Sequence, residues 1–179
     1  MAVLVEAISV IVRVDAVEAR YPGGWAAFRD AVPNATLASD REVARIGFMA
    51  SADVEAYIRH LETNGLNFIR HGTSIDVVVV DQQRGPTKPC AWLDWGHVSI
   101  SGDQIAACRL KGSKMMTLIM PEGWKFEGSL SQTFGFVPSG AEDKSLDIIE
   151  TKDGMDVYRN RLTGRLVYVG RTDGERRRD

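Results

Sequence analysis

Hydrophobic and polar positions along the first seventy residues predict strands and helices in turn. Residues 6–14 are rich in Ile and Val, which favours a strand because β-branched side chains fit a pleated surface. Trp25, Phe28 and Val32 then recur at helical spacing and would share one helix face. A short helix is therefore expected over residues 25–32, ending before Pro33, since proline disfavours helix at the residue before it.

A second helix is expected over residues 51–64. Ser51 or Asp53 can cap its start, and Gly65 supplies a left-handed stop after its last turn. Between these signals an apolar stripe of helical period predicts the face that packs on the core. The stripe consists of Val54, Tyr57, Ile58 and Leu61.

The short segments 35–39 and 42–49 predict a hairpin between the two helices, and residues 66–69 predict a further strand. The resulting order β-α-β-β-α-β is that of a split βαβ, or ferredoxin-like, module over residues 1–70. The predicted fold class is α+β.

In residues 71–171 the pattern changes to short strand candidates at close spacing. It predicts an antiparallel, mostly β part that shares the same core or sheet. Turn residues separate five short strand candidates, and residues 121–140 read as a long surface loop. A capping-box spacing predicts a short helix from Ser139 through Ile149. Residues 172–179 are expected to be a frayed, charged tail. The strand candidates are 75–81, 91–95, 97–101, 104–110 and 115–120.

A final hairpin is expected over residues 155–171, turning at Thr163 and Gly164. A two-residue turn would place Arg159 opposite Tyr168, whereas a longer loop with a glycine bulge would shift the register. The sequence leaves both alternatives open.

Composition narrows the class of protein. Apolar residues make up 44% and charged residues 26% of the chain, which are ordinary globular values, and the formal net charge is −2. Neither half has a basic excess, so we do not expect nucleic acid as a partner. No apolar run is long enough to span a bilayer. The two cysteines lack zinc-type spacing, so we expect no metal, no cofactor and a reducing, cytoplasmic location.

The densest cluster of reactive side chains lies at residues 90–97. It contains Cys90, Asp94 and His97, and an imidazole beside a thiol with an orienting carboxylate would make a nucleophilic site. The alternative, which we favour, is an ordinary buried or edge strand broken at Gly96 before His97. The cluster supports at most a small enzyme as an alternative function.

Aromatic and basic side chains supply the remaining candidates. Trp92, Trp95, Trp124 and Phe134 are candidates to line a ligand groove. For Trp124 and Phe134 the alternative, which we favour, is that they anchor their loop to the core. Arg159, Arg161 and Arg165 form a basic patch on the last hairpin that could hold an anion. With Tyr158 and Tyr168 as stacking platforms, the patch would support weak RNA binding; a solvated strand face is the simpler interpretation.

The sequence thus favours a non-catalytic cytosolic binding or interaction module. It would act as a small-ligand sensor or a partner-binding regulator, and an open sheet face or edge would build a homodimer. The small enzyme and the weak RNA binder remain the alternatives.

Overall fold

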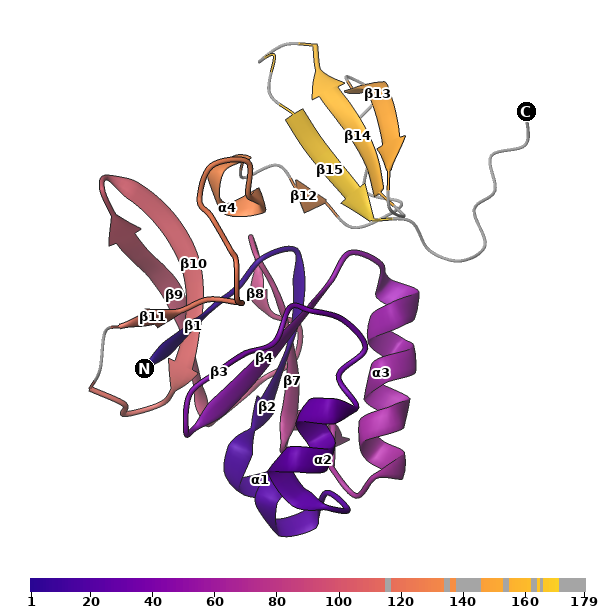
Figure 1. Cartoon of the computed structure of the whole chain (residues 1–179), viewed down its shortest axis with the longest axis vertical. Helices are drawn as coiled ribbons and strands as arrows, with labels where there is room; N and C mark the ends of the chain where they lie inside the picture. Colours follow the sequence, from indigo (N-terminus) through magenta and orange to yellow (C-terminus); the bar gives the residue numbers. More distant parts are fainter. Residues whose placement is uncertain are drawn as a thin grey trace.

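The computed structural model describes residues 1–114, 117–133, 136–137, 146–152, 155–161, 164 and 166–170. Over these residues the protein is α+β, as the sequence predicts, with more strand than helix (Figure 1). None of the helices in the described part of the chain has the length and apolar character needed to cross a bilayer.

The central sheet has five strands whose neighbours all run antiparallel. Val10 in its middle strand lies opposite Ile46 on one side and Val79 on the other. Both faces of this sheet are covered, so its three long strands are buried along nearly their whole length, which explains why their sequences are mainly apolar. In spatial order the strands are β3 (Ala38–Ser39), β4 (Val43–Phe48), β2 (Ile8–Arg13), β7 (Val77–Asp81) and β8 (Gly85–Pro86).

Three helices cover one face of the central sheet: α1 (Val14–Arg20), α2 (Gly24–Asp30) and α3 (Ser51–Thr63). The prediction for α3 is confirmed, including its buried stripe and the positive φ of Gly65. Its N-cap is Ala50, which makes no side-chain hydrogen bond, so the predicted Ser51 or Asp53 cap is wrong. The helix predicted over 25–32 corresponds to α2, where Phe28 is buried and Trp25 packs partly against the core.

A second sheet covers the other face. It is ordered β11 (Leu118–Ile119), β1 (Ala2–Leu4), β10 (Asp103–Leu110) and β9 (Leu93–Ile100). The apolar N-terminal run therefore serves two sheets, with β1 in one and β2 in the other. The chain crosses between them at Ala7, whose φ is +51°. This crossing places Glu6 at the end of the central sheet.

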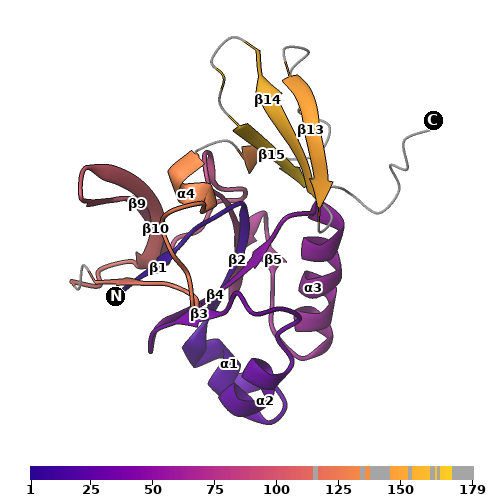
Figure 2. The ribbon, with the colours of Figure 1, turned by 45° about the horizontal axis from the view of Figure 1, so that its top comes forward.

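A third sheet lies at one end of the molecule, beyond the short helix α4 (Leu130–Thr133) (Figures 1 and 2). Tyr168 of this sheet packs against the core that lies between the central sheet and the three helices. Its strands are ordered β12 (Phe136–Val137), β15 (Leu166–Gly170), β14 (Met155–Asn160) and β13 (Leu146–Lys152).

The strand predicted at residues 66–69 is wrong in its pairing. Ile69 and Arg70 form β5, which pairs only with β6 (Thr73–Ser74) among the described strands. The place beside β2 is taken by β7, the Val-rich strand. A run of four valines buries more apolar surface between two covering layers than residues 66–69 can, and this favours β7 in the central position.

Three further predictions need correction. The helix expected through Ile149 is wrong, because residues 146–152 form strand β13; residues 139–145 lie outside the described part. Gly96 does not break its strand, since β9 runs through it. In the last hairpin Arg159 lies opposite Leu166 rather than Tyr168, so the register expected for a two-residue turn at Thr163 and Gly164 is not adopted. The tail at 172–179 also lies outside the described residues.

Candidate functional site

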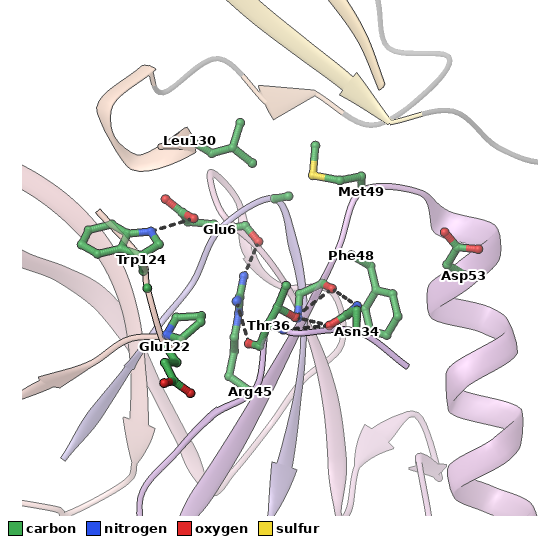
Figure 3. A pocket seen from close by; sticks show the side chains of 14 residues that line it. Glu6, Asn34, Thr36, Arg45, Phe48, Met49, Asp53, Glu122, Trp124 and Leu130 are labelled. Atoms are coloured by element: carbon green, nitrogen blue, oxygen red, sulfur yellow. Dashed lines mark hydrogen bonds between the residues drawn. The ribbon is translucent and has the colours of Figure 1, made fainter. Parts of the chain in front are cut away.

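An open cavity of about 490 Å³ lies at the end of the central sheet where β2 enters and β4 leaves (Figure 3). We call it the central cavity. Four separate stretches of chain contribute to its wall, so only the folded protein assembles it. They are residues 6–7, 34–36, 45–53 and 121–130.

Arg45 forms part of the wall, although its side chain is only 3% exposed. Each of its nitrogens donates a hydrogen bond: Nε to Ser9 Oγ at 3.0 Å, Nη1 to the Thr36 carbonyl at 3.2 Å and Nη2 to the Glu6 carbonyl at 3.0 Å. Burial lowers the pKa of Arg45 to about 10, and the Glu6 charge acts in the opposite direction. The guanidinium therefore remains cationic at neutral pH.

Gly47 provides the space for this guanidinium. A Cβ built at position 47 would lie 2.7 Å from Cζ of Arg45, closer than such atoms ever come. Thr36 and Asn34 hold the same stretch of backbone, because Gly47 N donates to Thr36 Oγ1 at 2.7 Å and Asn34 Nδ2 donates to the Gly47 carbonyl at 2.9 Å. The polar side of the cavity is thus fixed by a connected hydrogen-bond network.

Glu6 links the cavity to the segment that covers it. Its carboxylate accepts hydrogen bonds from Trp124 Nε1 at 3.1 Å, from Ser131 N at 2.8 Å and from Ser131 Oγ at 2.6 Å. Its carbonyl accepts from Arg45, so one residue joins the buried arginine to residues 124–131. Loss of the Glu6 carboxylate would remove the hydrogen bonds that hold residues 124–131 over the cavity. The Glu6 carbonyl would still accept from Arg45.

The rest of the central cavity is mainly apolar. Phe48, Met49, Trp124 and Leu130 surround it in Figure 3, with Asp53 on α3 at one side. A second cavity of about 530 Å³, the side cavity, continues along α3 to Tyr57 and His60. Both cavities are lined by Asn34, Phe48 and Asp53, which stand at their junction.

The predicted cluster at residues 90–97 is only partly brought together. Asp94 and His97 line a smaller cavity of about 290 Å³, but Cys90 is not among its lining residues. Asp94 pairs with Arg109 at 3.6 Å, and His97 contacts Trp95 edge-on. Because β9 is continuous and the two positions are three residues apart, Asp94 and His97 lie on opposite faces of the strand.

Both cysteines are free thiols, and burial raises the pKa of each. Cys90 packs against the core between the two large sheets. In the described part of the chain, no group of three or more His, Cys, Asp or Glu side chains is arranged to hold a metal ion.

The predicted aromatic candidates have different fates. Trp92 and Trp95 pack against the core between the two sheets, and the Trp92 ring lies 6.0 Å from the Arg13 guanidinium. Trp124 lines the central cavity. Phe134 lies outside the described residues.

The three arginines of the predicted basic patch are in different situations. Arg161 forms an ion pair with Asp147, with Nε donating to Oδ1 at 2.8 Å. Arg159 is exposed, and Arg165 lies outside the described residues. Tyr158 is buried, so it is not a free platform for a base.

Sequence reasoning missed Arg45, Gly47 and Glu6 as site residues. The available signal was an arginine inside an apolar strand, followed two positions later by glycine on the same face. Comparison of the chain with protein-family models, with curated proteins and with solved structures finds no match.

Proposed function

We propose that this protein is a non-catalytic module that binds a small amphipathic molecule in the central cavity. The observation that carries the proposal is the pairing of a buried arginine network with an apolar wall in one cavity of about 490 Å³. Ligand sites in proteins are typically of this size, mostly apolar, and contain a few fixed polar groups.

The lining residues favour binding over catalysis. They include neither cysteine nor histidine, and the polar groups around Arg45 already bond to one another. Such preorganised groups can orient a ligand at little entropic cost. The small enzyme built on Cys90, Asp94 and His97 is less well supported, because the thiol does not line the cavity that the other two share.

A fragment screen by protein-observed NMR tests this function. Fragments that bind should shift the signals of the Gly47 and Phe48 amides and the Trp124 indole. Leu130→Trp should weaken the affinity of these fragments at least tenfold by filling the cavity. Ile100→Trp is the matched control, since Ile100 is 40% exposed on β9, away from the cavity lining. Met49→Trp is a second filling variant. Hits that map elsewhere, or that bind both filled variants unchanged, would contradict the proposal.

We also infer that the chain up to Asp81 follows the split βαβ plan, with β7 as its fourth strand. Support comes from the spatial order β3, β4, β2, β7 with antiparallel neighbours, and from helices in both crossing connections. A cytoplasmic location remains a prediction. So does a homodimer, for which the long edge strand β9 is the natural contact and size-exclusion chromatography the test.

A further inference from the structure

We infer that the molecule held in the central cavity is an organic cation: an ammonium group on an apolar body, with the charged end at Asp53. The inference rests on the proposed function, and deepens it by naming the chemical class of the ligand.

The charges on the cavity wall favour a cation. The lining includes three carboxylates, on Glu6, Asp53 and Glu122, against the single guanidinium of Arg45. Arg45 is almost fully buried, and all three of its nitrogens donate to protein acceptors. An anionic ligand would therefore meet a wall of net negative charge, and an arginine whose three nitrogens each donate to a protein acceptor.

Asp53 is the carboxylate best placed to receive the charge. It lines both the central and the side cavity, and it is exposed to solvent. Among the described residues it has no ion-pair partner in the structure. In Figure 3 it projects from α3 at the side of the cavity, whereas Glu122 points away from the aromatic walls.

Aromatic rings complete the site. Phe48 and Tyr57 lie 5.4 Å apart between ring centroids and flank the junction where Asp53 stands, and Trp124 lies across the central cavity. Aromatic faces attract ammonium groups and also cover apolar chains. The ammonium would lie at Asp53 and Phe48, and the apolar body would extend toward Trp124 and Leu130.

Three probes of the same shape separate the alternatives: 2-phenylethylamine, 2-phenylethanol and phenylacetate, each titrated by NMR. The amine should bind about 3-fold to 5-fold tighter than the alcohol at low salt, and the preference should shrink at high salt. Asp53→Asn should remove the preference. Glu55→Gln is the matched control: it neutralises a carboxylate on the same helix that does not line either cavity, and it should retain the preference.

The two proposals fail differently. If the alcohol or the carboxylate binds as tightly as the amine, or if Asp53→Asn keeps the preference, the cation inference is overturned while the binding function stands. If none of the three binds but fragments still map to the cavity, the inference is again overturned alone. If the screen yields no cavity hits, both are overturned.

Discussion

The guanidinium of Arg45 lies in the space that a side chain at position 47 would occupy. This relationship explains why β4, a fully buried strand, has a glycine two positions after its one charged residue, Arg45. The glycine admits a charged group into the end of the sheet, and the charged group joins three segments through hydrogen bonds. Fold and candidate site therefore depend on the same pair of residues.

Gly47→Ala should destabilise the protein by about 1–3 kcal/mol, because the new methyl group must displace the Arg45 guanidinium from its acceptors. Urea unfolding measures the change. Gly96→Ala is the matched control, since a Cβ there meets nothing within 4 Å and should cost little. Equal stability of Gly47→Ala and the natural protein would show that Arg45 moves aside without cost.

Glu6→Gln should loosen residues 124–131. An amide in place of the carboxylate keeps one acceptor oxygen but turns an NH₂ group toward either Ser131 N or Trp124 Nε1, both of which are donors. The loss of about 1–3 kcal/mol should appear as faster hydrogen exchange at the Ser131 amide and the Trp124 indole. Glu127→Gln, an exposed change in the same segment, should leave both unchanged; equal exchange in the two variants would exclude a role for Glu6.

Stability should fall as the pH rises above about 9, and Cys108 should account for part of the loss. Burial raises the pKa of this thiol in the folded protein, whereas the unfolded thiol titrates near its ordinary value of 9.0. The contribution of the Cys108 thiol to the free energy of unfolding is therefore complete below pH 9. Above pH 9 this contribution is lost at up to about 1.4 kcal/mol per pH unit, since the unfolded state releases its proton first.

Urea unfolding at several pH values from 8 to 10 tests this dependence. Cys108→Ala should lower stability at pH 8 by creating a small cavity, but its stability should decline less steeply than that of the natural protein. Burial also raises the pKa of Cys90, and that residue is present in both proteins. Parallel slopes for the two proteins would rule out a titrating Cys108.

Helix α3 was predictable because its signals are local. Its apolar stripe and the glycine after its last turn all lie within fifteen residues, and the structure follows both. Only the cap was wrong: the chain bends at Ala50, which offers no side-chain acceptor. A local pattern fixes where a helix lies more firmly than it fixes the residue at its boundary.

Strand pairing was less predictable because it is decided between distant segments. Nothing near residues 66–69 shows that Val77–Asp81 competes for the place beside β2, and the outcome depends on apolar area buried between two layers. The central cavity is harder still. It joins Glu6, Thr36, Arg45 and Trp124, which only the finished fold brings together.

Cys90 should react slowly with a thiol reagent at neutral pH, and this prediction separates the binding module from the small enzyme. Burial raises the pKa of Cys90, and the thiolate is the reactive form, so labelling should be about tenfold or more slower than that of a free cysteine peptide. Cys108 is buried and should react only on unfolding, so Cys108→Ala isolates the Cys90 rate. A nucleophile activated by His97 would instead react faster than the peptide and lose that rate in His97→Ala. Slow labelling, unchanged by His97→Ala, would leave the central cavity as the better-supported site, because the thiol would then have no activating base.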